Sequence, residues 1–280
     1  MRNTLRILKS FIVGCHAFLA SKYSRLVGRF SPGVALDLFD LMRREIESRT
    51  VIVNHKSGNG EMVSLRLGTP NRIFLWRAQT FSEKEPETLA WIDKYGGEGA
   101  FFNVGANIGL DSLYYAQKHE SFVYAFEPSV KNLRGLAEKF FRNRLTERIT
   151  LFPLALSDSK GHSTFSLSSP DFGGALSSFG GHSARGVPPQ TKLVYPLPGL
   201  SLDDAISLGF LTEPPVISKI DVGGIENLIL RGAKETLKPT PFKPVLVEFD
   251  ESDAEATVDI YRQMEEAGFA LESREPSQTF

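Results

Sequence analysis

The chain has 280 residues, 41% of them hydrophobic and 23% charged, which is typical of a folded globular protein and excludes disordered and fibrous classes. Its 32 basic and 33 acidic side chains nearly cancel, so we expect no nucleic-acid partner to be attracted by net charge. The single cysteine, Cys15, excludes a disulfide framework and a cysteine-rich zinc site, and it fits a reducing, cytoplasmic setting.

Residues 1–30 carry basic side chains but no acidic one. Their apolar run, 11–20, is about half of the ~20 residues that a membrane-spanning helix needs. Apolar residues recur at helical spacing from Leu5 to Leu26, which predicts a basic amphipathic helix. This helix either packs on the following domain or contacts an anionic membrane surface peripherally; a secretory signal is a third, less favoured interpretation.

Residues 31–97 form a small α+β lead-in segment in our prediction. We expect a helix over 30–49, short strands over 51–54, 62–67 and 72–77, and a helix over 85–95 that the glycines at 96, 97 and 99 end.

Residues 98–280 alternate between apolar runs and amphipathic helices. The predicted strands and helices, in chain order, are 100–104, 110–117, 122–126, 130–141, 149–155, 202–208, 216–222, 225–230, 244–249, a helix from about 254 to 268, and a strand over 269–272. This β-α-β order predicts an α/β fold with a doubly wound, mostly parallel sheet.

An insertion over 157–200, rich in serine, glycine and proline, interrupts the alternation. Long loops of this kind are often functional, so it is either a loop that covers the substrate or a flexible spacer. We expect strands over 164–167 and 192–195. His182 and Arg185 are candidate contacts to a polar acceptor, with solvated loop residues as the alternative.

The junction between the first predicted strand and its helix, Phe101 to Gly109, is the strongest candidate binding site. Gly105 permits a tight turn and close approach of a ligand, and Gly109 allows the helix to pack near the strand and offer free amides. A lone Gly-x-x-x-Gly is more often a plain strand-to-helix turn than a binding site. The residues at the end of the next strand distinguish these two interpretations.

That next strand ends in Glu127, which lies 22 positions after Gly105 and close to the ~20-residue offset at which a carboxylate reaches ribose hydroxyls. Dinucleotide enzymes share this geometry, but here Asn107 replaces the glycine that admits a pyrophosphate. The pattern therefore favours a ligand without a pyrophosphate, such as S-adenosyl-L-methionine, with NAD as the lesser alternative.

Three further residues end strands. Asp158 follows the third strand and is either an acceptor for an adenine amino group or a capping residue. Lys219 and Asp221 share one face of a buried strand that ends in glycines. We expect Asp221 to orient an acceptor hydroxyl or accept its proton and Lys219 to contact substrate; an interior ion pair is the alternative.

With these motifs, the chain resembles the FkbM family of methyltransferases. The resemblance covers about residues 75–250 and rests on the segments 80–89, 103–109, 125–128, 155–158, 201–204 and 219–222. It implies a Rossmann-like class I fold with strand order 3-2-1-4-5-7-6, S-adenosyl-L-methionine as the cofactor, and O-methylation of a hydroxyl on a sugar, polysaccharide or polyketide. No metal is evident.

Three features depart from the family pattern. Asn103 stands where the family often has an acid that contacts the cofactor through water, and Gly223 stands where the family usually has a glutamate. The chain ends shortly after the predicted last strand, which leaves little length for the seventh strand. Gly223 motivates a second hypothesis, a protein that binds the cofactor without catalysis.

Overall fold

The computed structural model describes residues 18–29, 31–167, 173–174, 177–181, 193–238 and 244–276. The chain divides into two compact units, Met1–Arg49 and Thr50–Phe280. The site residues predicted from the sequence all belong to the second unit.

Two helical stretches make up the described part of the first unit. Residues 18–29 are helical, and α2 spans Pro32–Ser48, which agrees with the predicted helix over 30–49. Exposed apolar side chains in the first stretch are Phe18, Leu19, Tyr23 and Leu26. Within the described residues, no helix is both long and apolar enough to cross a membrane.

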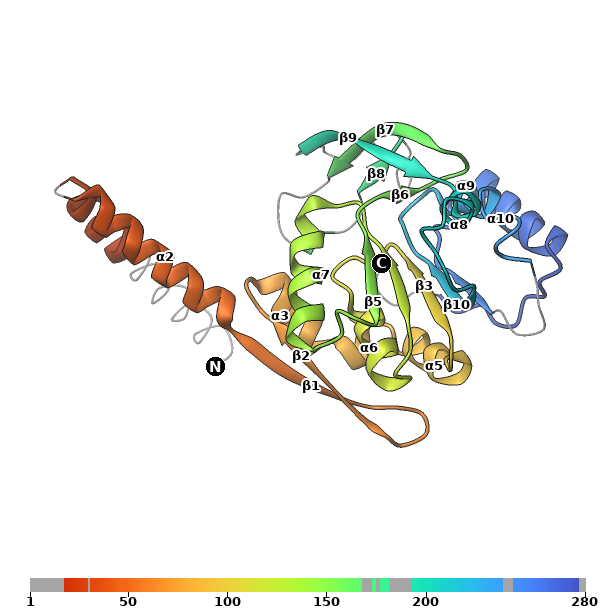
Figure 1. Cartoon of the computed structure of the whole chain (residues 1–280), viewed down its shortest axis with the longest axis horizontal. Helices are drawn as coiled ribbons and strands as arrows, with labels where there is room; N and C mark the ends of the chain where they lie inside the picture. The colour runs from red at the N-terminus through yellow and green to blue at the C-terminus, as the bar shows by residue number, and fades with distance from the viewer. Residues whose placement is uncertain are drawn as a thin grey trace. The chain divides into compact units, whose positions relative to one another are not determined.

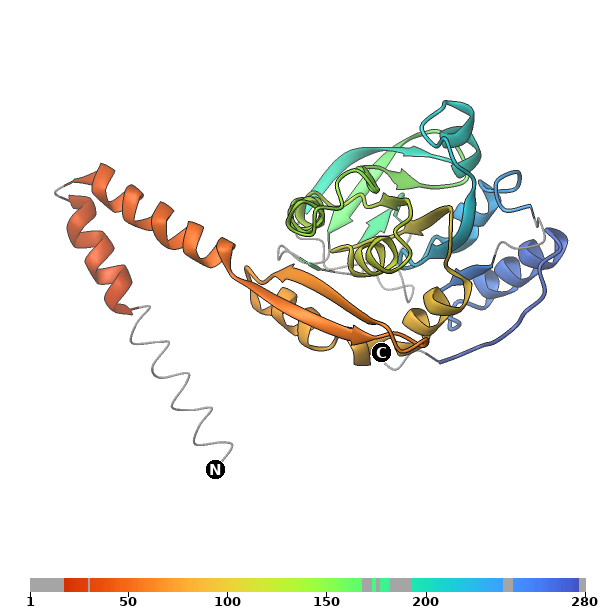
Figure 2. The ribbon, with the colours of Figure 1, turned by 60° about the horizontal axis from the view of Figure 1, so that its bottom comes forward.

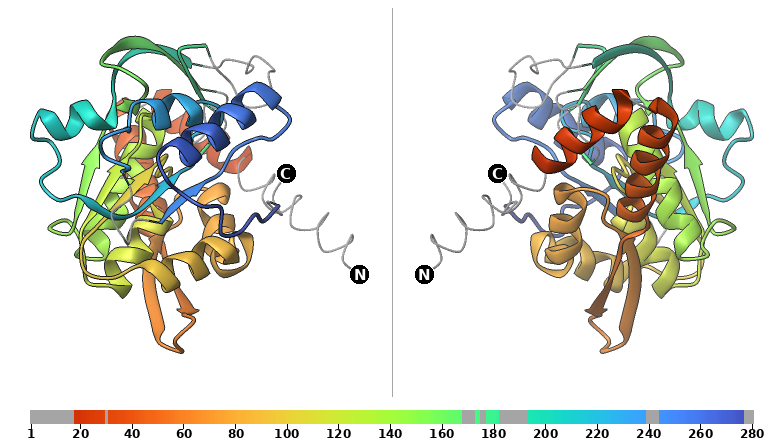
Figure 3. Two further views of the ribbon diagram at one scale, coloured as in Figure 1. Left: turned by 90° about the vertical axis from the view of Figure 1, so that its right-hand side faces the viewer. Right: turned by 90° about the vertical axis from the view of Figure 1, so that its left-hand side faces the viewer.

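The second unit begins with a hairpin whose inner face is buried. Strands β1 (Thr50–Lys56) and β2 (Met62–Gly68) pair antiparallel, as predicted. Val63, Leu65 and Leu67 alternate with exposed residues along β2. They pack against two helices of the main body, α6 (Leu110–Lys118) and α7 (Val130–Arg142). The tip of the hairpin projects from the unit (Figure 3).

Three helices follow: α3 (Arg72–Gln79), α4 (Phe81–Lys84) and α5 (Pro86–Tyr95). The predicted strand over 72–77 is therefore wrong. Asn71 caps α3 by accepting a hydrogen bond from the Phe74 amide, and Phe74 and Ala78, four residues apart, form the buried face. The capping and the helical spacing outweigh the β preference of this aromatic segment.

A five-stranded parallel sheet forms the centre, in the order β11-β10-β3-β4-β5. Its strands are β3 (Ala100–Val104), β4 (Val123–Phe126), β5 (Ile149–Phe152), β10 (Pro215–Ile220) and β11 (Val245–Val247). Its helices are α6 (Leu110–Lys118), α7 (Val130–Arg142), α8 (Leu202–Ser207), α9 (Glu226–Arg231) and α10 (Ala254–Glu266). Numbered along the chain, the order is 3-2-1-4-5, which confirms the doubly wound α/β fold.

Each face of the sheet has its own apolar core. Along β4, Val123 and Ala125 belong to the core shared with α5, α6, α7 and β2, whereas Tyr124 and Phe126 belong to the core shared with α8, α9 and α10. Helices α7 and α10 accordingly lie on opposite sides of the sheet (Figures 1 and 2). Because both faces are covered, the ends of the strands are the exposed edge at which ligands bind in such folds.

The insertion forms a second sheet. Strands β6 (Ala155–Leu156), β7 (Gly161–Leu167), β8 (Ser178–Phe179) and β9 (Leu193–Leu200) join in the order β6-β9-β7-β8. The predicted strand over 164–167 is confirmed, and of the strand predicted over 192–195 the described residues, 193–195, lie in β9. The strand predicted over 149–155 stops at Phe152, before Pro153, which lacks the amide that a continuing ladder needs.

The end of the chain departs from the prediction. Residues 269–272 are described but form no strand, so the predicted final strand is wrong. Among the described residues, the sheet holds no sixth or seventh strand, and the family order 3-2-1-4-5-7-6 is present only in its first five positions. Glu272 instead accepts hydrogen bonds from Lys94 and Tyr95 on α5.

Candidate active site

The turn after β3 passes unusually close to the end of β10. Gly105 has φ of +84°, and a Cβ at this position would lie 1.8 Å from the backbone oxygen of Asp221. The amides of Gly105 and Ala106 both donate to the carbonyl of Phe126 at the end of β4. The turn therefore joins the ends of three neighbouring strands, and only glycine fits its first position.

Asn107 holds the middle of the turn. Its backbone is left-handed, with φ of +50°, a conformation that asparagine tolerates better than most residues. Its amide nitrogen donates to the Glu127 carboxylate at 2.7 Å, and its side-chain Nδ2 donates to the Gly174 carbonyl at 3.4 Å. Its Oδ1 is buried without a partner. Gly109 then starts α6 as its N-cap residue.

Glu127 is 5% exposed and faces the turn. It accepts hydrogen bonds from the Asn107 and Ser129 amides and from the Asn132 side chain. Burial raises its pKa to about 7, although these donors act in the opposite direction. A carboxylate has about four acceptor positions, so capacity for one further donor, such as a ribose hydroxyl, remains.

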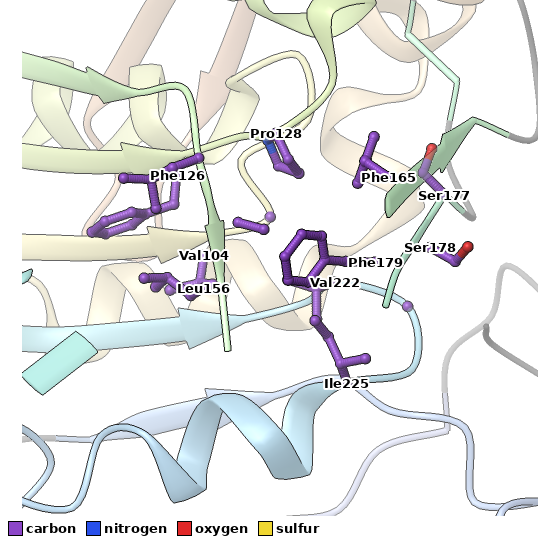
Figure 4. A pocket seen from close by; sticks show the side chains of 14 residues that line it. Val104, Phe126, Pro128, Leu156, Phe165, Ser177, Ser178, Phe179, Val222 and Ile225 are labelled. Carbon is purple, nitrogen blue, oxygen red and sulfur yellow. The ribbon is translucent and has the colours of Figure 1, made fainter. Parts of the chain in front are cut away.

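A cavity lies beyond the ends of the strands, between the sheet and the insertion (Figure 4). It offers about 30 Å³ of space to a water-sized molecule, within about 390 Å³ of space between atoms that includes open solvent. Its walls are mostly apolar and come from the turn, the strand ends, the insertion and the loop after β10: Val104, Gly105, Phe126, Pro128, Leu154, Ala155, Leu156, Phe165, Ser177, Ser178, Phe179, Val222, Gly223 and Ile225. Apolar and aromatic walls suit a flat heterocycle such as adenine.

A charged cluster surrounds Lys219 at the end of β10. The Lys219 side chain is almost fully buried, and its Nζ lies 2.9 Å from Asp111 Oδ2, 3.3 Å from Asp221 Oδ2 and 3.4 Å from Glu85 Oε2. Burial lowers the pKa of Lys219, but the three carboxylates outweigh it and hold the pKa well above its usual value. Lys219 is thus a buried cation that orders acids from three elements, which matches the ion-pair alternative and leaves little surface for substrate.

Glu248 lies next to Asp221 across the parallel ladder. Ile220 pairs with Val247, and the Glu248 amide donates to the Ile220 carbonyl at 2.9 Å, so the two acids follow neighbouring strand ends. Burial, and then the charge of Asp221, raises the pKa of Glu248 to about 7. Within the described chain, the Glu248 carboxylate makes no hydrogen bond or ion pair. Its carboxylate is therefore available to bind a ligand or to accept a proton.

Glu226 shapes the loop after β10. Its carboxylate accepts hydrogen bonds from the amides of Val222, Gly223 and Gly224. Gly223 has φ of +82°, so a glutamate there, as in the usual family pattern, would have to adopt a strained left-handed backbone. The three loop amides already have Glu226 as their hydrogen-bond acceptor, so they do not need a glutamate at position 223.

The remaining predicted residues are placed as follows. Asn103 is buried and donates to the Ser112 hydroxyl on α6 at 2.8 Å. Asp158 is exposed, accepts hydrogen bonds from Ser157 and Ser159, and does not line the cavity. His182 and Arg185 lie outside the described residues. The structure therefore brings Gly105, Asn107, Glu127, Lys219 and Asp221 together, but not Asp158.

Four residues of the site were missed from the sequence. Glu85, Asp111, Glu226 and Glu248 each stand beside a predicted element, but only the fold shows what they contact. The one available signal was position: Asp111 lies in the first turn of the helix after the glycine turn, and Glu248 follows a predicted strand. Among the described residues, no group of three or more His, Cys, Asp or Glu side chains is arranged to hold a metal ion.

A protein-family model, the methyltransferase FkbM domain, matches residues 103–271, which is more than half of the chain. The chain belongs to the FkbM methyltransferase family. The FkbM assignment implies S-adenosyl-L-methionine as the cofactor and methyl transfer as the class of reaction, and it removes the NAD alternative. The match includes the glycine turn and the two acids Asp221 and Glu248, which follow β10 and β11.

Two solved structures match part of the chain. A methyltransferase FkbM from Methylobacillus flagellatus KT is 16% identical with a TM-score of 0.42, over 60% of this chain and 37% of that protein. A precorrin-6y C5,15-methyltransferase from Geobacter metallireducens GS-15 is 14% identical with a TM-score of 0.41, over 67% of this chain and 72% of that one. The chain thus spans well under half of the Methylobacillus protein. No curated protein sequence matches it.

The residues present fit this cofactor. The turn at Gly105 leaves no room for a side chain, the neighbouring cavity has apolar walls, and Glu127 retains acceptor capacity. Among the described residues, four buried side-chain polar atoms lack partners, and two of them belong to this region: Asn107 Oδ1, an acceptor, and Arg77 Nε, a donor. Buried polar atoms are rarely left unpaired in folded proteins, so a polar ligand between these groups would satisfy them.

Proposed function

We propose that this FkbM protein methylates a hydroxyl group on a sugar, polysaccharide or polyketide-type acceptor. The observation that carries the proposal is the pair of neighbouring acids, Asp221 and Glu248, at the strand ends next to the glycine turn. An acid beside the methyl donor is suited to orient an acceptor hydroxyl and remove its proton.

The proposal gives separate roles to the two halves of the site. Gly105, Asn107, Gly109 and Glu127 would hold the cofactor, which supplies an electrophilic methyl group on a sulfonium centre. The protein's main contribution is to align the acceptor oxygen, since positioning accounts for much of the rate of such displacements.

The two acids differ in what they can do. Asp221 is paired with Lys219, so it is suited to accept a hydrogen bond and orient the acceptor. Glu248 has no such pair in the described part of the chain, and burial raises its pKa to about 7. A base with a pKa near the working pH is the most effective, so Glu248 would take the acceptor's proton.

The test is release of S-adenosylhomocysteine from S-adenosyl-L-methionine in the presence of candidate sugars, polysaccharides and polyketides. We expect release with at least one hydroxyl acceptor, and loss of release when that hydroxyl is already methylated. If only nitrogen, carbon or thiol acceptors are methylated, the proposed acceptor chemistry is wrong.

A second candidate function is cofactor binding without catalysis. Gly223 supports it, because the loop after β10 lacks the carboxylate that the family usually carries there. Binding of S-adenosylhomocysteine without turnover on any acceptor would favour this alternative. Turnover that depends on Glu248 would exclude it.

We also propose peripheral contact of residues 1–30 with an anionic membrane surface. The supporting observation is that Phe18, Leu19, Tyr23 and Leu26 are exposed on a helical stretch with three basic residues, Lys22, Arg25 and Arg29, and no acidic one. Co-sedimentation with vesicles that contain phosphatidylserine, but not with neutral vesicles, would support it.

A further inference from the structure

Arg77, on α3, is a partly buried cation with no role in the reaction proposed above. Its Nε is buried and has no hydrogen-bond partner. Among the described residues, the guanidinium makes one hydrogen bond, from its NH2 group to the Gly173 carbonyl at 3.3 Å. Within the described part of the chain, no carboxylate lies at ion-pair distance from it. A buried charge without a counter-ion is costly, and proteins rarely keep one that has no ligand.

Helix α3 holds Arg77 in a fixed position. Phe74, one turn earlier, packs so closely on α7 that a Cβ on Gly135 would lie 2.5 Å from its ring. The Lys139 Nζ lies 3.9 Å from the centre of the same ring. The Asn71 cap fixes the first turn of the helix. The guanidinium is therefore carried by a well-packed helix rather than by a loose loop.

Hydrogen bonds to one short segment place Arg77 near the glycine turn. Its NH2 group donates to the Gly173 carbonyl at 3.3 Å, and the carbonyl of the next residue, Gly174, accepts from the Asn107 side chain at 3.4 Å. Burial lowers the pKa of the guanidinium, and the charges of Glu85, Asp221, Asp111 and Glu127 act against this. Arg77 and Asn107 therefore contact neighbouring residues at the turn where the cofactor site begins.

The charges around Arg77 also match those of the cofactor. Methionine in the cofactor carries a carboxylate, an ammonium group and a sulfonium. The four acids Glu85, Asp111, Asp221 and Glu248 outnumber the two cations of the cluster, Lys219 and Lys84. The acidic cluster thus suits the ammonium and sulfonium groups of the cofactor. Arg77, which has no ion-pair partner among the described residues, suits the cofactor's carboxylate.

We propose that Arg77 binds the carboxylate of the cofactor's methionine moiety. This inference rests on the proposed function, but it concerns a residue outside the segment that matches the family model. Guanidinium binds carboxylate through two parallel hydrogen bonds, and the Nε donor is one of the groups used in that geometry.

The test is calorimetric binding of S-adenosylhomocysteine and of its decarboxylated analogue to the wild-type chain, to Arg77→Met and to the exposed control Arg72→Met on the same helix. We expect the wild type and Arg72→Met to prefer the carboxylated ligand about ten- to a hundredfold, the range for a hydrogen bond to a charged group. Arg77→Met should bind both ligands equally.

A second measurement separates a binding role from a structural one. Removal of an unpaired buried charge should raise the thermal unfolding midpoint of the ligand-free protein in Arg77→Met, whereas loss of a structural contact would lower it. Equal binding of both ligands by the wild type, or an unchanged preference in Arg77→Met, overturns the inference alone. Binding of neither ligand by the wild type overturns the proposed function and the inference together.

Discussion

The two halves of the site are built in different ways. Around Gly105, Asn107 and Glu127, backbone groups make the site: the Asn107 amide donates to a carboxylate 20 residues away, and the two preceding amides donate to the Phe126 carbonyl. Around Lys219, side chains make the site, and Glu85, Asp111 and Asp221 come from three separate segments. The first half is a local motif, and the second exists only after the chain has folded.

This difference has a chemical consequence. Glu127 near the turn and Glu85 in the cluster carry opposite pKa shifts: burial raises the pKa of Glu127 to about 7, while for Glu85 the charges of Lys219 and Lys84 outweigh burial and bring the pKa to about 2. Burial also raises the pKa of Asp221, and it brings the pKa of Glu248 to about 7. Of these four acids, Glu85 is therefore the one that is held firmly in its charged form.

The largest expected effect is on the rate. Glu248→Gln should lower kcat by about 10²- to 10⁴-fold, the usual contribution of a general base. In the wild type, kcat should rise with pH through about 7, because burial and Asp221 raise the pKa of Glu248 to that value and the base acts when deprotonated. The pH–rate profile of the variant should lose this limb, whereas a variant of the exposed Glu255 on α10, Glu255→Gln, should keep it. If Glu248→Gln kept the wild-type pH–rate profile, another group would be the one that accepts the acceptor's proton.

The next effect is on stability. Lys219→Met leaves three carboxylates without their shared cation, and breaking a buried ion pair in this way costs about 3–5 kcal/mol. The free energy of unfolding, measured by urea denaturation, should fall by that amount. The matched control is Lys238→Met, which removes the exposed pair with Glu235 and should cost less than about 1 kcal/mol. Equal losses in both variants would mean that the cluster adds no more than a surface pair.

The smallest expected effect is a pH dependence of the cofactor half. The pKa of Glu127 rises from 4.5 to about 7 on folding, so the folded state binds a proton more tightly and its stability falls as pH rises through that interval. The group contributes about 3 kcal/mol over this interval at 1.36 kcal/mol per pKa unit. Glu127→Gln should flatten the unfolding free energy between pH 5 and 7. Glu85, whose pKa is lowered to about 2, should act with the opposite sign and only below pH 4.5.

The same comparison shows what the sequence can predict. Gly105, Asn107 and Glu127 were found because a strand, a turn and the next strand are consecutive, and their geometry follows from local rules. Five sheet strands were found for the same reason. Lys219 and Asp221 were predicted to share a face, which their 3.3 Å pair agrees with.

The missed features depend on tertiary contacts. Helix α3 was predicted as a strand because Ile73 to Trp76 favour β structure, and only the cap at Asn71 and the burial of Phe74 and Ala78 reveal the helix. Glu85 and Asp111 lie 134 and 108 positions from Lys219, and no periodicity links residues so far apart. The strand predicted over 269–272 had the right residues but no neighbouring strand among those described.

The central claim is that the glycine turn and its neighbours bind S-adenosyl-L-methionine. Calorimetric titration of the full chain with S-adenosylhomocysteine, beside NAD as a comparison, tests it most directly. We predict saturable binding of one S-adenosylhomocysteine per chain and no binding of NAD. Binding of NAD, with no binding of S-adenosylhomocysteine at millimolar concentration, would contradict the claim.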